Sequence, residues 1–338
     1  MKKLFISMLA VAALASCSQE DVIVADKGDL IGFNSFVENS TRATDPSYST
    51  SGKGVALEAF DVYGAVKAGD AYLNIFAGNT VTKGGANYGA AWSMAEDAPK
   101  QYWIAGADYI FDAVVDATEV VKDKATGLPT ELKYSASTQK DMLHNRVTTT
   151  GKPATNNGIV TFNFTHLLSK VNFTVTNEDK GATGYSFVVK NINFAGNVAG
   201  VYNVATAAWD NSKFTTDNTA LGNERTVTVD GVDTKVKNIV VPTDAEKVEL
   251  GTEVLFLPGT YKITFTVDIL YNNKLVTTTN YPAEGTYTQT LEQNKAYNFN
   301  VTVSVGDRIQ FTAAEMPEWN YDVNNSGTVD ANDNIKLQ

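Results

Sequence analysis

The clearest ligand spacing in this chain of 338 residues lies near its C-terminal end. Positions one, three, five, seven, nine and twelve of a loop are occupied by Asp322, Asn324, Ser326, Thr328, Asp330 and Asp333. This is the spacing of an EF-hand-type calcium loop, which binds the ion through oxygen atoms and has a glycine at position six for the sharp turn. Gly327 occupies that position, and Thr328 would contribute its backbone carbonyl. Ser326 replaces the commoner Asp or Asn, and the alternative interpretation is a polar tail that matches the spacing by chance.

Cys17 is the only cysteine of the chain and follows a short apolar segment. Two lysines precede the apolar run of residues 4–15, which is too short to span a bilayer as a helix. This order predicts a cleaved signal peptide over residues 1–16. Because the sequence Leu-Ala-Ser-Cys that ends at Cys17 resembles the bacterial lipobox, we expect Cys17 to carry an acyl anchor and residues 17–29 to form a tether. The alternative is an ordinary secretory signal that ends near a cysteine.

The composition narrows the possible classes of function. The net charge of -11 argues against nucleic acid or anionic lipid as a partner. His144 and His166 are the only histidines, so little imidazole is present for a catalytic or metal centre. His166 lies in an alternating segment, where we expect a hydrogen-bonded core residue, and His144 has no evident partner. We therefore expect no enzymatic activity and no cofactor, apart from calcium in the tail.

The elements that must position these residues are β-strands almost throughout. Residues 31–37, IGFNSFV, alternate apolar with polar or small side chains, and many later segments do the same. Asp230-Gly231 and Asn272-Asn273 separate pairs of such segments, which predicts two hairpins. Many short strands with turn residues between them predict an all-β chain built of antiparallel sandwiches. In such sandwiches, we expect the four tryptophans to be core or sheet-face residues rather than a sugar-stacking platform.

The length suits two sandwiches in tandem. The polar stretch of residues 148–158 is the best boundary between them. This predicts an N-terminal sandwich over residues 30–157, a C-terminal sandwich over 158–319 and a polar tail over 320–338.

In the order of its segments, the chain resembles the fimbrillins of Bacteroidetes, the subunits of type V pili. The resemblance rests on the lipobox, on residues 31–43 ending in Thr-Arg-Ala, and most specifically on FNFTHLLSKVNFTV at residues 162–175. It implies transthyretin-like sandwiches and export as a lipoprotein of the outer membrane. It also implies a structural subunit of a surface fimbria that contributes to adhesion.

The resemblance further implies a mode of assembly. An Arg-specific protease would cut between Arg42 and Ala43, and the first strand, residues 30–42, would leave. The apolar residues of that strand are Ile31, Phe33, Phe36 and Val37. A strand from the C-terminal part of another subunit would fill the groove, as in other cases of strand addition. Candidate donor strands are residues 301–315 and the polar tail.

Two other functions remain open at the level of sequence. One is a surface lipoprotein that binds a glycan or a protein and never polymerises. The other is a secreted carbohydrate-active enzyme. The expected partners of a fimbrillin are other fimbrial subunits, the Arg-specific protease and, through the lipid, the outer membrane before processing.

The tail gives a first testable prediction. If residues 322–333 form a calcium loop, both the full chain and a peptide of residues 316–338 release or absorb heat on titration with calcium, measured by isothermal calorimetry. A lack of heat at millimolar calcium in both samples removes the calcium hypothesis.

Overall fold

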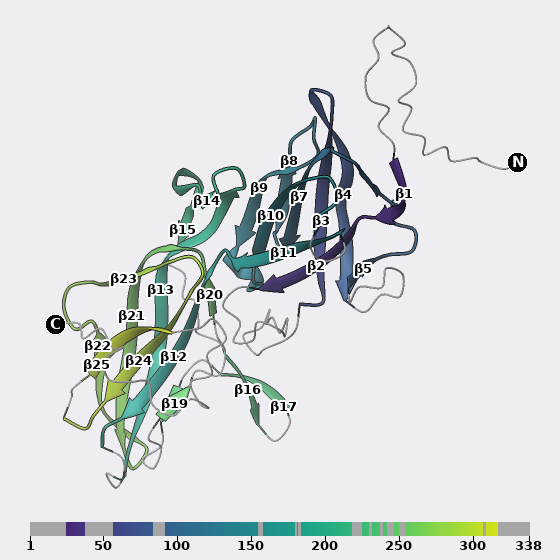
Figure 1. The fold of residues 1–338 in the computed structure, drawn as a ribbon. Helices are drawn as coiled ribbons and strands as arrows, with labels where there is room; N and C mark the ends of the chain where they lie inside the picture. The colour runs from purple at the N-terminus through teal and green to yellow at the C-terminus, as the bar shows by residue number, and fades with distance from the viewer. Residues whose placement is uncertain are drawn as a thin grey trace, which may run out of the picture.

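The computed structural model describes residues 25–37, 57–83, 92–154, 158–179, 181, 184–217, 225–229, 232–236, 239–241, 247–249, 254–306 and 309–316. For residues 25–28, 36, 37 and 225–249, the side chains are not described. Within these ranges the chain is all β, apart from two short 3-10 helices, η1 (Ala136–Thr138) and η3 (Asn211–Lys213). The predicted all-β class is confirmed, and Figure 1 shows an elongated molecule with one group of strands at each end.

The first group is a seven-stranded sheet. Its order is β2 (Gly32–Val37), β11 (Ile159–His166), β10 (Leu143–Thr150), β7 (Asp108–Val115), β3 (Ala59–Ala68), β4 (Ala71–Lys83) and β5 (Trp92–Met94). One face of all seven strands contributes to a single aromatic core, so the sheet curls around that core. Its two edge strands, β2 and β5, come into contact as a result.

The second group is a sandwich of two sheets. The five-stranded sheet contains β19 (Lys247–Glu249), β12 (Ser169–Asn177), β24 (Lys295–Val303) and the edge strand β25 (Ile309–Met316), with β20 (Val254–Phe256) also on β12. The nine-stranded sheet has the order β22 (Lys274–Tyr281), β21 (Gly259–Tyr271), β13 (Tyr185–Asn203), β9 (Pro129–Ser135) and β8 (Glu119–Lys122). Short strands flank this order: β14 (Ala208–Trp209), β15 (Thr215–Asp217) and β18 (Ile239–Val241) pair with β13, and β23 (Tyr287–Leu291) pairs with β21.

Two small two-stranded sheets complete the described strands. One joins β1 (Ala25–Leu30) to β6 (Tyr102–Ile104), and the other joins β16 (Arg225–Val229) to β17 (Val232–Val236). The antiparallel β16–β17 pair confirms the hairpin predicted at residues 230–231. The second predicted hairpin is confirmed between β21 and β22, where Asn272 and Asn273 have φ angles of 45° and 60°. Such positive φ values are those of a type I′ turn, which asparagine tolerates well.

The long strand β13 joins the two groups of strands. Its first half pairs with β21, and its last residues pair with β9, which comes from the first part of the chain. A central cluster that includes Leu132, Leu167 and Leu257 packs where these strands meet. β11 was assigned by sequence to the second unit, but it lies in the seven-stranded sheet beside β10. The predicted boundary therefore falls between two neighbouring strands of one sheet, and the division into two units stays a prediction.

Both histidines are buried and hydrogen-bonded to aspartates. His166 Nδ1 lies 2.7 Å from Asp141 Oδ2, which confirms the prediction of a core histidine. Burial raises the pKa of the Asp141 carboxyl, although the interactions with His166 and Lys170 act in the opposite direction. The sequence showed no partner for His144, but the structure places its Nε2 2.8 Å from Asp112 Oδ1. This partner comes from β7, 32 residues earlier in the chain.

Asp112 provides a test of the buried polar network between β7 and β10. Its side chain is fully buried and also accepts hydrogen bonds from Arg146 Nε and Nη2, at 2.9 and 2.8 Å. We expect Asp112→Ala to lower the free energy of unfolding by about 3–5 kcal/mol, because it removes the buried partner of the largely buried His144 and the half-buried Arg146. Guanidinium denaturation measures this change. Lys140→Ala, which removes an exposed ion pair to Asp116, is the control and should cost under about 1 kcal/mol; equal effects of the two variants would contradict the prediction.

Candidate functional site

The candidate site is the edge strand β2 and the groove in which it lies. β2 pairs with β11 in parallel, in a register that runs from Gly32 opposite Ile159 to Val37 opposite Phe164. In the described part of the chain, β11 is the only strand that pairs with β2. The strand is therefore held by backbone hydrogen bonds along one side. Sheet edges of this kind accept other strands unless they are shielded.

Phe33 fills the centre of the first aromatic core. Its ring centroid lies 5.3 Å from that of Phe76, 5.9 Å from Phe111 and 5.8 Å from Phe162. Phe33 is 3% exposed, although it belongs to an edge strand. The period of two of a strand places Ile31 and Ser35 on the same face, and both are buried as well. Ile31, Phe33 and Ser35 therefore present an aliphatic, an aromatic and a small polar side chain to the core, in that order.

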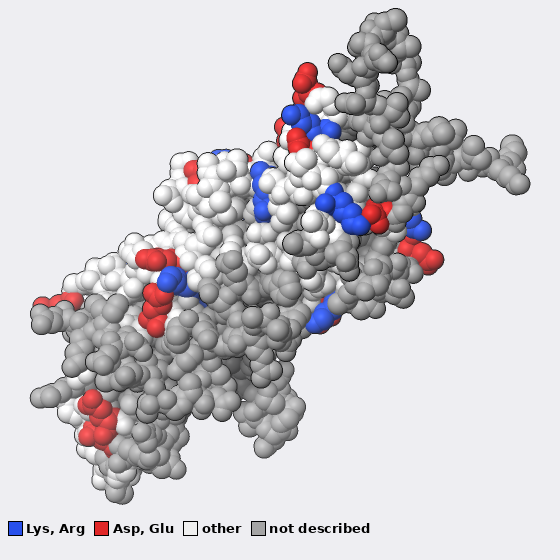
Figure 2. Space-filling view, in the orientation of Figure 1, with Lys and Arg blue, Asp and Glu red and all other residues white. Residues whose placement is uncertain are grey.

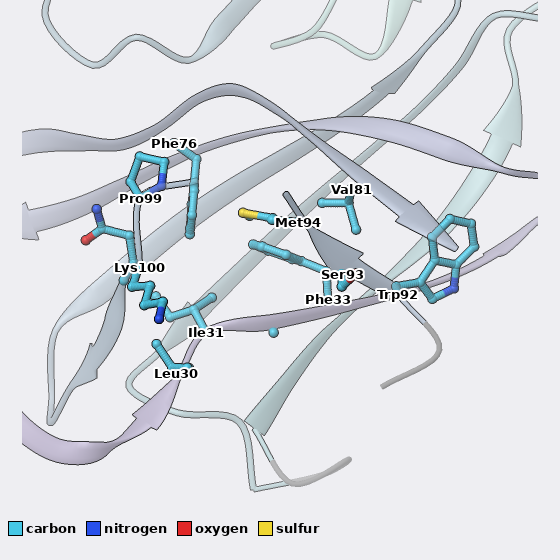
Figure 3. A pocket seen from close by; sticks show the side chains of 12 residues that line it. Leu30, Ile31, Phe33, Phe76, Val81, Trp92, Ser93, Met94, Pro99 and Lys100 are labelled. Atoms are coloured by element: carbon cyan, nitrogen blue, oxygen red, sulfur yellow. The ribbon is translucent and has the colours of Figure 1, made fainter. Parts of the chain in front are cut away.

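A small hollow lies beside β2, and Figure 3 shows the side chains that line it. Ile31, which directly precedes β2, and Phe33 of β2 line one side, and Trp92 and Met94 of β5 line the other. These two strands are the opposite edges of the seven-stranded sheet. Among the described residues no strand pairing joins them, so side chains rather than backbone hydrogen bonds close the sheet at this seam.

The segment before β2 is attached at a second place. Leu30 of β1 lies opposite Tyr102 of β6, and the Ile31 backbone N–H donates to the Gln101 carbonyl over 2.9 Å. Lys152 Nζ lies 2.6 Å from Asp29 Oδ2, in an ion pair whose side chains are 38% and 41% exposed. Such an exposed pair contributes at most about 1 kcal/mol. The sequence analysis did not predict these attachments, because neither β6 nor Lys152 lies near β1 in sequence.

Several residues of the sequence-based site lie outside the described residues. These are Cys17, Arg42, Ala43 and all six proposed calcium ligands, Asp322, Asn324, Ser326, Thr328, Asp330 and Asp333. Phe36 and Val37 lie in β2, but their side chains are not described. The roles of all these residues stay predictions. Within the described ranges, no group of three or more His, Cys, Asp or Glu residues could hold a metal ion.

Among the described residues, the tryptophans and the charges on the face shown in Figure 2 indicate no second site. Trp92 and Trp103 are each 2% exposed core residues, as predicted, and Trp209 packs on the central cluster. Trp319 lies outside the described residues. On the face shown in Figure 2, the described lysines, arginines and acidic residues are scattered, without a large area of one sign. In the part of the chain that the structure describes, no helix has the length and hydropathy of a membrane span.

Comparison with known proteins decides the family. The model of the fimbrillin-like family matches residues 41–319, which is most of the chain. The chain belongs to the fimbrillin-like family. This membership supports a role as a fimbrial subunit that associates with other fimbrial subunits at the cell surface, rather than the role of an enzyme.

A solved structure shares the fold of this fimbrillin-like chain. A fimbrial protein from Bacteroides vulgatus has a TM-score of 0.54 at 14% identity, over 86% of this chain and 99% of that protein. The fimbrial anchor protein Mfa2 from Porphyromonas gingivalis has a TM-score of 0.35 at 10% identity, over 85% of this chain and 96% of Mfa2. Among curated proteins, none matches the sequence.

The ring cluster around Phe33 gives a testable prediction. We expect Phe33→Ala to lower the free energy of unfolding by about 3–5 kcal/mol, because it leaves a cavity between three phenylalanine rings. Backbone amides of β2 should also lose protection in hydrogen exchange. Tyr102→Ala, an aromatic truncation on the neighbouring β6 at a side chain 44% exposed, is the control and should change stability far less. Equal losses in the two variants would show that Phe33 does not hold β2 in place.

Proposed function

We propose that this fimbrillin-like chain is a structural subunit of a surface fimbria that polymerises by donor-strand exchange. In this proposal, Cys17 carries the lipid during export to the outer membrane. A protease then cuts between Arg42 and Ala43, and the segment that contains β1 and β2 leaves. The single observation that carries the proposal is the position of Phe33, a fully packed core residue on a strand with one described strand partner.

The energetics of β2 favour replacement over simple loss. Removal of the strand would expose the apolar sites of Ile31 and Phe33 and leave one edge of β11 without hydrogen bonds. Each buried polar group without a partner costs about 1–3 kcal/mol, and truncation of a buried phenylalanine costs about 3–5 kcal/mol. A subunit without β2 therefore has a strong tendency to bind another strand. The incoming strand restores both the hydrogen bonds and the packing.

The interactions that hold residues 25–37 in place are compatible with loss of this segment after a cut at Arg42. β2 pairs with β11, β1 pairs with β6, and the ion pair between Asp29 and Lys152 is exposed. All of these interactions are lateral contacts of one continuous segment, residues 25–37, at the start of the described chain. A cut at Arg42 would disconnect this segment from the sheet that it completes. None of the strands that build the central cluster would be broken.

Limited proteolysis tests the proposal. We expect trypsin to cut the chain that begins at Ser18 after Arg42, and the product to form oligomers that resist denaturing gels without boiling. Mass spectrometry identifies the cut. The Arg42→Gln/Lys53→Gln double variant, which lacks both basic residues between residues 38 and 56, should stay monomeric, and Lys53→Gln alone should behave like the parent chain. A verified cut that leaves a stable monomer would contradict strand exchange and favour a surface lipoprotein that does not polymerise.

A further inference from the structure

Three buried titratable side chains, Asp141, His166 and Lys170, take no part in the proposed function. Their exposed fractions are 0%, 1% and 4%. His166 Nδ1 lies 2.7 Å from Asp141 Oδ2, and the Leu167 backbone N–H donates to the Met142 carbonyl over 3.0 Å. Lys170 follows at the start of β12, after the short turn that leaves β11. The loop that carries Asp141 is therefore fixed to the turn that leads to Lys170.

A second attachment holds the same loop beside Lys170. Gln139, two residues before Asp141, binds the backbone of Leu255 twice. Its Nε2 donates to the Leu255 carbonyl over 3.1 Å, and the Leu255 N–H donates to its Oε1 over 3.0 Å. Leu255 of β20 lies directly opposite Lys170 of β12 in the five-stranded sheet. The loop thus contacts the strand next to Lys170, at the position that faces it.

The side chain of Lys170 lies toward the central cluster. Residues directly opposite each other in a sheet have their side chains on the same face, and Lys170 lies opposite Leu255 and Ala296. Both of these neighbours belong to the central cluster, as does Met142, the residue after Asp141. Burial raises the pKa of the Asp141 carboxyl, and the charge of Lys170 acts against this effect. The lysine head group is therefore within electrostatic reach of the carboxyl.

We infer that the side chains of Asp141 and Lys170 condense to an amide bond. A bond forms between Asp141 Cγ and Lys170 Nζ, and the bond between Cγ and Oδ2 breaks. The leaving hydroxyl takes one hydrogen from the amine and departs as water, so the reaction requires no oxidant, reductant or other reactant. The inference concerns a covalent modification within one chain and does not depend on strand exchange.

The buried position favours this reaction. An apolar site disfavours the charged forms of carboxyl and amine, and an amine attacks a neutral carboxylic acid more readily than a carboxylate. Two groups held together react without the cost of an encounter, and well-oriented pairs reach effective concentrations of about 10⁵–10⁸ M. The product is a neutral amide. It removes the free-energy cost of keeping an aspartate and a lysine away from water.

His166 supplies the proton transfer. Its Nδ1 lies 2.7 Å from Oδ2 of Asp141, the oxygen that leaves, and this distance allows direct transfer. The protonated ring gives its proton to the leaving oxygen, and the neutral ring then takes a proton from the amine. The ring returns to its starting state at the end of the reaction. General acid–base catalysis of this kind contributes about 10²–10⁴-fold to a rate.

The other buried histidine–aspartate pair has no such reactant. The cation beside His144 and Asp112 is Arg146, which donates to both carboxylate oxygens. A guanidinium is not deprotonated in proteins and offers no amine for a bond to the carboxyl. Asp112 should therefore stay unmodified and serves as an internal comparison.

The bond would join the two groups of strands. Asp141 lies just before β10 of the seven-stranded sheet, and Lys170 lies in β12 of the five-stranded sheet. A covalent link between them closes a ring of the chain over residues 141–170. It prevents these elements from separating completely under load or in denaturant.

The intact mass of the chain that begins at Ser18 tests the inference. Measured in denaturing solvent, the folded and purified protein should weigh one water molecule less than its sequence. Lys170→Met, which lacks the amine, should have the full mass of its sequence. The matched control is Lys190→Met, which removes the lysine of the half-buried pair with Asp268 and should still lack one water. Parent-like circular dichroism establishes that each variant has folded.

Fragment spectra of tryptic peptides locate the missing water without any variant. They should join Asp141 to Lys170 and show no cut after Lys170, because trypsin does not cleave at an acylated lysine. Asp112 should appear unmodified. A parent chain of full mass, or a missing water at any other residue, would overturn the inference. Loss of water in Lys170→Met would do the same.

The role of His166 is tested by a rate. Parent and His166→Gln chains are isolated unfolded, refolded by dilution, and sampled over time by intact mass. The variant should lose water at least about tenfold more slowly than the parent. Equal rates in two chains with parent-like circular dichroism would show that His166 does not carry the proton. Because cleavage and oligomer formation do not enter these measurements, none of these outcomes bears on strand exchange.

Discussion

An apolar sheet face must be covered and a sheet edge must be paired or shielded, and in this chain both requirements meet in one short strand. β2 is paired along one side, yet it carries Phe33 into the centre of the first aromatic core. The residue that completes the core thus belongs to a strand with few backbone partners. Such a strand is replaceable in principle, because the core requires a pattern of side-chain sizes and not a particular covalent connection.

The remainder of the molecule is fixed more firmly. β13 has strand partners along both sides and pairs with strands from both parts of the chain. The buried pairs of His144 with Asp112 and of His166 with Asp141 connect neighbouring strands and loops next to the central cluster. None of these four residues lines the hollow between β2 and β5. A change of strand at that seam therefore leaves the connection between the two ends of the molecule intact.

Local sequence patterns predicted the elements well and their partners poorly. Alternation of apolar residues identified β2 and β11, and paired turn residues identified the hairpins β16–β17 and β21–β22. His166 is buried because it shares one face of a strand with Phe162 and Phe164. The polar stretch at residues 148–158 was interpreted as a boundary, but the strands on either side of it are neighbours in one sheet. A polar loop has the same composition whether it joins two sandwiches or two strands.

The sequence by itself determined the all-β class, the strand periodicity and the resemblance to fimbrillins, because each depends on residues close together in the chain or on their order. Only the tertiary structure decided that β2 is an edge strand parallel to β11, that Phe33 lies among Phe76, Phe111 and Phe162, and that Asp112 is the partner of His144. These contacts join residues tens of positions apart. A period of two assigns a side chain to a face of its strand, but the strand that lies beside it depends on how the whole sheet is packed.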